Sequence, residues 1–238
     1  SRKIEYFKSN EYNIYLYWEN KKGSKRHKYL DICLQSIKKH NKNVVVLTPK
    51  NLYNHIPKEK VNKKVWLLDK IAQRADYLRY LVLNHNGGFW FDFDTICLNN
   101  IDFLFKNLEN YDMVYHSEQF LGVRKGALNN LISELEYKLN NRKNMTFYWT
   151  ELGVTTLKKY FKDLKIYYID NNKYIKPKIP YGAKKNKYIL WENNVKKEDF
   201  IKPNQIILKL YNHGYSEKEK NELVSNKNNL FNKIIINN

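Results

Sequence analysis

The chain has 238 residues, with 43 Lys or Arg against 24 Asp or Glu, which gives a formal net charge of +19 at pH 7. Its 42% hydrophobic and 15% aromatic residues exclude a disordered or low-complexity chain, and its length suits one domain with a sizeable core. Two cysteines exclude a disulfide framework or a four-thiolate zinc site, and no apolar run approaches the roughly 20 residues that span a bilayer. We therefore expect a soluble, cytoplasmic protein; the first residue is Ser1, which leaves open whether a preceding segment is missing.

A strand, a helix and a second strand are predicted near the N-terminus. Residues 14–18 (IYLYW) form a short aromatic and apolar run that predicts a strand, and residues 44–47 are typical of a buried parallel strand. Between them, residues 27–40 place four apolar side chains at i, i+3, i+4 and i+7, which is one face of a helix. These side chains are Leu30, Cys33, Leu34 and Ile37. The order predicts a βαβ unit and a parallel sheet.

A second helix is predicted over residues 68–86, where Gly87 and Gly88 end it, and a strand over 89–95 follows. The later elements are expected as strands over 113–116, 120–123, 166–169 and 206–210 and as helices over 126–141, 150–163 and 217–233. Because strands and helices alternate and no linker divides the chain, we expect an α/β fold in a single domain of residues 1–238.

Residues 87–95 (GGFWFDFDT) carry the most informative pattern. If residues 89–94 are extended, Trp90, Asp92 and Asp94 point to one side of the sheet. Two acids at the end of an apolar strand repel each other unless a cation offsets their charge, and Mg²⁺ characteristically joins one or two carboxylates to substrate phosphates. The C-terminal edge of a parallel sheet is also where α/β proteins bind ligands. The alternative is a pair of acids in a solvated loop.

The helix before this strand carries Asp76 and Arg79 at i and i+3, so both lie on one face. One interpretation is a surface ion pair, which is worth little free energy. The other is that the helix presents Asp76 to sugar hydroxyls and Arg79 to an oxygen or phosphate of a ligand held by the following strand. The spacing by itself favours the ion pair.

Three segments in order, 15–20 (YLYWEN), 29–40 and 72–94 (AQRADYLRYLVLNHNGGFWFDFD), resemble the DXD sugar-transferase superfamily. This superfamily includes glycosyltransferase family 32, the capsular-polysaccharide-synthesis proteins and, more distantly, the glucosyltransferase domains of large clostridial toxins. The resemblance is strong over about residues 14–105, although Ala75 stands where the family pattern often has serine.

Beyond that region the resemblance is patchy. Residues 211–216 (YNHGYS) are similar to the family's C-terminal His-containing motif. Residues 150–155 (TELGVT) loosely match a mid-chain acceptor segment, in which Val154 replaces the family's proline.

The resemblance implies a GT-A fold, which is a Rossmann-like, mixed but mostly parallel sheet flanked by helices. It implies a metal-dependent transfer, with Mn²⁺ or Mg²⁺, that moves a sugar with retention of configuration from a nucleotide sugar to a glycan, lipid-linked or protein acceptor, as in polysaccharide biosynthesis. Family frequency favours a UDP-sugar donor over a GDP-sugar. A donor and metal half is expected over about residues 1–115 and an acceptor half over about 116–238.

Carried over by position, Trp18 would stack on the nucleotide base, with Tyr17 nearby. Asp76 and Arg79 would touch the donor sugar and are the candidate catalytic pair. Retaining enzymes of this kind require no obvious base on the protein, so no further catalytic residue is nominated.

The same resemblance places three residues around the metal and diphosphate. Asp94 would ligate the metal directly, and Asp92 would contact ribose, sugar or metal-bound water. His213 would be a metal ligand or a phosphate contact. The metal set expected from sequence is therefore Asp92, Asp94 and His213, and the two acids also bind the donor.

Two residues in the second half are candidates for the acceptor side. Trp149 would stack on a sugar ring if it is exposed, but core packing is equally compatible with the sequence. Glu151 is a candidate acceptor contact, and its alternative is a carboxylate at a helix N-terminus, where the helix dipole favours it.

The positive charge supports one competing class, a basic nucleic-acid-binding module without catalytic activity. Only six residues are Arg, the usual residue for phosphate and base recognition, and no nucleic-acid motif is present, so we expect no nucleic-acid partner. A nucleotidyl transferase would need a glycine-rich phosphate loop or a Walker-type lysine, and neither occurs. The densest basic stretch, residues 173–197, is compatible with an anionic membrane, an acidic substrate or a solvated surface.

Overall fold

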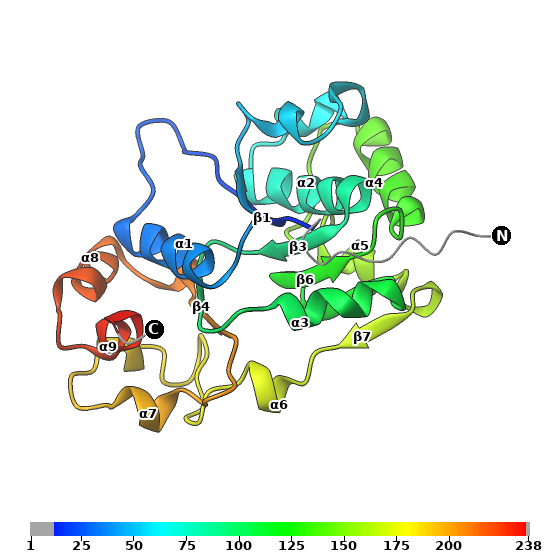
Figure 1. Cartoon of the computed structure of the whole chain (residues 1–238). Coiled ribbons are helices and arrows are strands. Elements are labelled where there is room, and N and C mark those ends of the chain that lie inside the picture. The colour runs from blue at the N-terminus through cyan, green and yellow to red at the C-terminus, as the bar shows by residue number, and fades with distance from the viewer. Residues whose placement is uncertain (1–11, 237–238) are drawn as a thin grey trace. The chain divides into compact units, whose positions relative to one another are not determined.

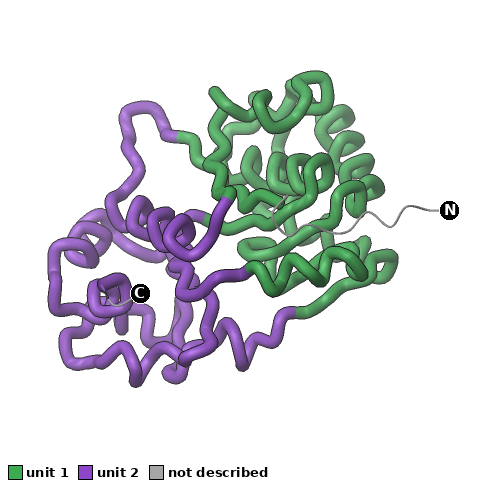
Figure 2. Tube along the Cα trace, viewed as in Figure 1, with its two compact units in different colours: residues 1–19, 43–92, 102–168 green, residues 20–42, 93–101, 169–238 purple. Residues whose placement is uncertain are grey.

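A computed structural model describes residues 12–236 of the chain. These residues form two compact units, each assembled from three separate stretches (Figure 2). The first unit takes residues 12–19, 43–92 and 102–168, and the second takes residues 20–42, 93–101 and 169–236. The expected division into a donor half and an acceptor half concerns function and stays a prediction.

The first unit is built on a six-stranded sheet of order β2-β1-β3-β6-β5-β7 (Figure 1). The strands are β1 (Ile14–Tyr17), β2 (Val44–Leu47), β3 (Gly88–Phe91), β5 (Met113–Ser117), β6 (Phe120–Val123) and β7 (Ile166–Tyr168). Only β6 runs antiparallel to its neighbours, so five of the six strands point the same way. This confirms the predicted α/β class with a mixed but mostly parallel sheet.

The position of each strand in the sheet explains its burial. β1 and β3 are paired on both sides and are fully buried. β2, which was expected to be a buried strand, lies at the edge of the sheet, and only Leu47 of its four residues is buried. Its register beside β1, with Ile14 opposite Val44, confirms the parallel pairing of the predicted βαβ unit.

Helices cover both faces of this sheet. The helices of the unit are α2 (Ile71–Asn86), α3 (Asp102–Phe105), α4 (Asn129–Asn141) and α5 (Val154–Lys158), of which α3 was not predicted. α2 packs on β3, β6 and α4, on the face where Trp90 of β3 joins the core (Figure 1). On the other face, the ring of Phe105 in α3 lies 4.9 Å from that of Phe89.

The strand predicted over residues 89–95 is wrong in its extent. β3 ends at Phe91, and the chain resumes as β4 (Thr95–Cys97), which belongs to the second unit and pairs only with β8 (Ile207–Lys209) among the described strands. The aromatic alternation continues across the break, so the sequence pattern gave no sign that the hydrogen-bonding partner changes. Asp92 and Asp94 therefore fall on opposite sides of the boundary between the two units, and not in one strand.

In the second unit, α1 (Lys28–His40) packs on β4 and on α8 (Glu217–Ser225). The four apolar residues predicted to share a face of α1 are all buried. The helix that links β1 and β2 thus belongs to a different unit from the two strands. The remaining helices of this unit are α6 (Asn171–Tyr174), α7 (Lys197–Phe200) and α9 (Leu230–Ile236).

Two predicted helices are shorter or divided. The helix expected over 150–163 is reduced to α5, because residues 148–153 form turns closed by Glu151 N–H to Tyr148 O and Gly153 N–H to Thr150 O. The helix expected over 217–233 is split into α8 and α9. Among residues 12–236, no helix combines the length and hydropathy that crossing a membrane requires.

Candidate functional site

Arg79 of α2 lies in a group of three carboxylates in the first unit. Its Nη2 is 3.0 Å from Asp76 Oδ1 and 3.7 Å from Asp92 Oδ1, and its Nη1 is 3.3 Å from Glu118 Oε2. The residue is 4% exposed, so the interpretation of Asp76 and Arg79 as a surface ion pair is wrong. The structure brings together three residues predicted for the donor site and adds Glu118.

The end of β3 places Asp92 beside this group. Trp90 Nε1 donates a hydrogen bond to Asp92 Oδ1 at 2.9 Å, and the Arg79 guanidinium carbon lies 5.3 Å from the centre of the Trp90 ring. Asp92 N–H donates to Gln119 O at 2.9 Å, which holds the chain just beyond β3. The side chains of Trp90 and Asp92 therefore lie on the same side of the chain, as the alternation predicted for an extended segment requires.

Glu118 joins α2 to the start of α5. Besides Arg79, Glu118 Oε2 accepts a hydrogen bond from Val154 N–H at 2.9 Å. A Cβ atom added to Gly153 would lie 2.9 Å from Glu118 Oε2 and 3.0 Å from Asp76 Oδ2, so only glycine allows this close approach. Glu118 stands between β5 and β6, and the sequence carries no signal for its role because its partners come from distant segments.

Burial raises the pKa of Asp76 to about 7, with further increases from Glu118 and Asp92 that Arg79 opposes. The buried guanidinium of Arg79 is thus surrounded by the side-chain carboxyl groups of Asp76, Asp92 and Glu118. Nε of Arg79 is buried and has no hydrogen-bond partner among the described residues. Such a group favours a ligand that supplies both hydrogen-bond donors, for the carboxylates, and an acceptor, for the guanidinium.

The predicted base-binding residues lie at the end of β1. Tyr17 is buried, and its hydroxyl donates to Glu19 Oε2 at 2.7 Å, while Arg74 of α2 forms an ion pair with the same carboxylate. Trp18 is half-buried, and its N–H donates to Leu47 O at 2.9 Å. Glu19 and Arg74, which were not predicted as site residues, therefore fix the segment that carries the tryptophan.

The second unit holds Asp94 and His213. Asp94 Oδ1 forms an ion pair with Lys209 of β8, and Oδ2 accepts a hydrogen bond from Asn212 N–H at 3.1 Å. Asn212 begins the 3₁₀ turn Asn212–Gly214, which carries the exposed His213. Asp94 therefore contacts the turn that carries His213, which the family resemblance predicts to lie near the diphosphate.

The carboxylates fit a hard divalent cation by ligand type, since Mg²⁺ takes one or two carboxylates and completes its shell with phosphate oxygens and water. In residues 12–236, however, no three His, Cys, Asp or Glu side chains are grouped as a metal site.

The loop between α4 and α5 carries two exposed aromatic residues, Tyr148 at 58% and Trp149 at 53% exposure. Gln73 of α2 holds this loop by donating to Phe147 O at 3.1 Å and to Tyr148 O at 3.2 Å. Lys70 Nζ lies 5.6 Å from the centre of the Trp149 ring. The alternative of core packing for Trp149 is therefore excluded.

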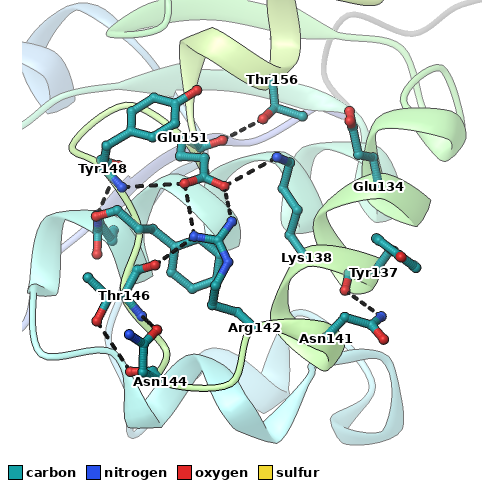
Figure 3. Close-up of polar contacts among 12 residues, drawn as sticks. Glu134, Tyr137, Lys138, Asn141, Arg142, Asn144, Thr146, Tyr148, Glu151 and Thr156 are labelled. Atoms are coloured by element: carbon teal, nitrogen blue, oxygen red, sulfur yellow. Dashed lines mark hydrogen bonds and ion pairs between the residues drawn. The ribbon is translucent and has the colours of Figure 1, made fainter.

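Glu151 anchors the same loop through hydrogen bonds and ion pairs of its carboxylate (Figure 3). It is 3% exposed, and its carboxylate accepts hydrogen bonds from Arg142, from Lys138 Nζ at 3.3 Å and from Tyr148 N–H at 3.4 Å. It lies three residues before α5 and is not part of that helix. The Glu151 carboxylate is therefore paired with two cationic side chains of the protein, those of Arg142 and Lys138.

One family model and two solved structures are similar to parts of this chain. Residues 4–121 match the family model of the glycosyltransferase sugar-binding region containing a DXD motif, just under half of the chain. The match includes all the predicted donor residues from Tyr17 to Asp94 and leaves His213 outside. A search of curated proteins gave no match.

Two solved structures of the glycosyltransferase GlyE from Streptococcus pneumoniae TIGR4 are similar to this chain. The apo form is 13% identical, with 70% of this chain and 47% of that chain covered and a TM-score of 0.43. The other is 10% identical, with 96% and 63% covered and a TM-score of 0.48. This chain spans less than two thirds of the length of either.

The matched region includes β1, α2 and β3, which carry or precede the predicted donor residues. Residues 4–121 are therefore similar to the sugar-binding region of DXD-motif glycosyltransferases, and Asp92, Phe93 and Asp94 correspond to the motif that names this family model. The competing interpretation as a nucleic-acid-binding module without activity is not supported by any of these comparisons.

Proposed function

We propose that the protein is a metal-dependent, retaining glycosyltransferase that moves a sugar from a nucleotide-sugar donor to a hydroxyl acceptor. The observation that supports this most is the buried Asp76–Arg79 pair, whose guanidinium also lies 3.7 Å from Asp92 of the motif. We favour a UDP-sugar over a GDP-sugar because UDP donors are more frequent in the family that the sequence resembles.

On the donor side, Asp76 and Arg79 bind and orient the sugar. The carboxylate accepts hydrogen bonds from sugar hydroxyls, and the guanidinium donates to an oxygen of the sugar or phosphate. Trp18 stacks on the base, while Tyr17, whose hydroxyl is committed to Glu19, supports it from the interior. Fixing the donor in this way supplies part of the rate by orientation.

On the diphosphate side, Asp92, Asp94 and His213 would hold Mn²⁺ or Mg²⁺. When bound, the cation stabilises the charge that develops on the departing nucleoside diphosphate. Asp92 and Asp94 are two residues apart, so their Cα atoms are separated by at most about 7 Å however the chain bends. Lys209 of β8 forms an ion pair with Asp94, so this carboxylate is already oriented within the second unit.

On the acceptor side, we propose that Trp149 stacks on a sugar ring of a glycan, which is one of the three acceptor classes expected, beside lipid-linked and protein acceptors. Glu151 acts on the acceptor indirectly, because its buried carboxylate holds the loop through Arg142 and Lys138. A cytoplasmic location, a peripheral association with membranes and a role in polysaccharide biosynthesis stay predictions.

Donor hydrolysis tests this function. Nucleotide sugars with uridine or guanosine are incubated with the protein in Mn²⁺, in Mg²⁺ and in EDTA, and the released nucleoside diphosphate is measured. We expect activity only with a divalent cation, and a loss of at least a hundredfold in Asp94→Asn. Asp163→Asn, which removes an exposed acid outside the site, is the matched control. Full activity in EDTA, or in Asp94→Asn, would contradict the proposal.

A further inference from the structure

A cavity of about 420 Å³ lies in the second unit and is not used by the proposed reaction. Leu98 and Asn99, which follow β4, form part of its wall, whereas Asp94 precedes this strand. The three residues of β4, at about 3.3 Å each, stand between the cavity and the motif carboxylate. The cavity is therefore separate from the metal and diphosphate residues of this unit.

The lining is strongly basic. Lys178, Lys197 and Lys202 line the cavity against the carboxylate of Glu198, and His40 at the end of α1 adds an imidazole. Lys197 is the first residue of α7, and Lys202 follows the end of that helix by two residues. Lys178 and Lys197 belong to the basic stretch 173–197, which has no role in the proposed donor site. Several cations around a cavity attract an anion.

Backbone carbonyls orient two of the ammonium groups. Lys178 Nζ donates to the backbone oxygen of Glu198 at 2.6 Å, and Lys202 Nζ donates to that of Asn172. An ammonium has three donors, so each of these bonds positions the group and leaves it able to bind an anion. Lys197 is half-buried, and burial and the charge of Lys39 both lower its pKa, although Glu198 opposes them.

The floor of the cavity is apolar. Leu98 and Ile201 are 5% and 8% exposed, and Pro203 also lines the cavity. We propose that the cavity binds a phosphate-bearing ligand, with the three ammonium groups on the phosphate oxygens and the apolar floor against an uncharged part of the ligand. Lysine ammonium groups are common phosphate ligands as point charges, which suits a site with few arginines.

Isothermal titration calorimetry with inorganic pyrophosphate, in EDTA, tests this site on the whole chain. We expect saturable binding that weakens at least tenfold in the double variant Lys197→Ala/Lys202→Ala. The charge-matched control is Lys143→Ala/Lys162→Ala, which removes two exposed lysines of the first unit and should stay within twofold of the wild type. Asp94→Asn should bind pyrophosphate as the wild type does.

Two results would overturn the proposal: no saturable binding, or equal weakening in the control pair. If the double variant fails to fold, Lys178→Ala replaces it, since this side chain is exposed, and a loss of about threefold is expected. Because the cavity and the donor site are tested by different variants, failure of one proposal leaves the other standing.

The source of the phosphate is resolved by sedimentation with vesicles. Binding to phosphatidylglycerol vesicles but not to phosphatidylcholine vesicles, lost in the double variant and displaced by pyrophosphate, assigns the site to a lipid headgroup. Equal sedimentation of wild type and double variant, with pyrophosphate binding still dependent on the lysines, assigns it to a soluble phosphorylated ligand.

Discussion

Burial determines the hydrogen-bonding strength of Arg79 and the pKa of Asp76. An exposed Asp–Arg pair on a helix contributes little, whereas a buried guanidinium surrounded by carboxylates is a strong and directional hydrogen-bond donor. The same burial makes the charge state of Asp76 depend on conditions near neutral pH. Two predictions at the level of single residues follow from this.

The first concerns the pH dependence of stability. Burial raises the pKa of Asp76 from 3.8 to about 7, so between these values the folded protein holds a proton that the unfolded chain has released. The resulting stabilisation is fully present below about pH 4 and is lost as the pH rises through 7. We expect the free energy of unfolding of the wild type, relative to Asp76→Asn, to fall by a few kcal/mol across this range, on the order of the shift. Urea unfolding at a series of pH values measures this, and a constant difference would contradict it.

The second concerns Glu118. Glu118→Gln keeps the shape of the side chain and an oxygen for Val154 N–H, but it removes one negative charge near Asp76. The pKa of Asp76 should therefore fall, and the pH-dependent loss of stability should move to lower pH. Donor hydrolysis should drop about tenfold, because the loss of a charge-assisted partner of Arg79 costs about 1.5 kcal/mol. Glu109→Gln, an exposed acid at the end of a 3₁₀ turn, is expected to change neither quantity.

Among the elements, the loop between α4 and α5 shows how packing prepares a surface. Its interior is fixed by Gln73 and Glu151, while Tyr148 and Trp149 point to solvent. Fixing a loop before the ligand arrives reduces the entropy lost on binding. Glu151 and Gly153 are the two places where this preparation can be tested.

Variants of Glu151 and Trp149 should distinguish a residue that positions the loop from one that contacts the acceptor. Glu151→Gln leaves Arg142 and Lys138 without their carboxylate and should destabilise the protein by about 2 kcal/mol, below the 3–5 kcal/mol of a fully buried pair because Arg142 is 34% exposed. Trp149→Ala should leave the unfolding free energy within about 0.5 kcal/mol and raise the acceptor KM several-fold. Chemical unfolding and acceptor kinetics measure both. A large loss of stability in Trp149→Ala would show that the ring is structural.

Gly153 should be intolerant of any side chain. In Gly153→Ala the new methyl group would press on the carboxylates of Glu118 and Asp76 and push them away from Arg79. We expect about 1–3 kcal/mol of destabilisation and a marked fall in donor hydrolysis. Gly182→Ala is the control, because the nearest atom to its Cβ would be Tyr211 Oη at 3.8 Å. Unchanged hydrolysis in Gly153→Ala would show that the carboxylate group is not needed.

Local patterns predicted the elements that local forces determine. The apolar face of α1, the β1 and β2 runs and the glycine that ends α2 with φ of +70° were all readable from sequence. The break between β3 and β4 was not, because it depends on which strand pairs with which. The division between α8 and α9 was also missed: the side chain of Asn232 donates to Leu223 O and Asn226 O, which stabilises the turn between the helices.

The same limit applies to the candidate site. Asp76 and Arg79 were found because they are close in sequence and because the family resemblance singles them out. Contacts between distant segments determine the roles of Glu118 and Gly153 and form the cavity of the second unit that Lys178 and Lys202 line. No local sequence pattern indicates such contacts.

For the whole molecule, the main feature is that each unit is assembled from three stretches of chain (Figure 2). The polypeptide passes from one unit to the other after residues 19, 42, 92, 101 and 168. One of these passages lies inside the DXD motif itself, so Asp92 is held by the first unit and Asp94 by the second. The motif residues are thus also the covalent connection between the two units.

The repeated passage of the chain between the two units restricts how segments of this protein can be exchanged with those of a relative. A chimera with a relative made by a single crossover at any position would combine residues of two parents within at least one unit, and the interior of that unit would be mismatched. Exchanging one unit intact requires replacing three segments at once. New specificities in this architecture should therefore arise by substitution within a unit far more readily than by shuffling of gene fragments.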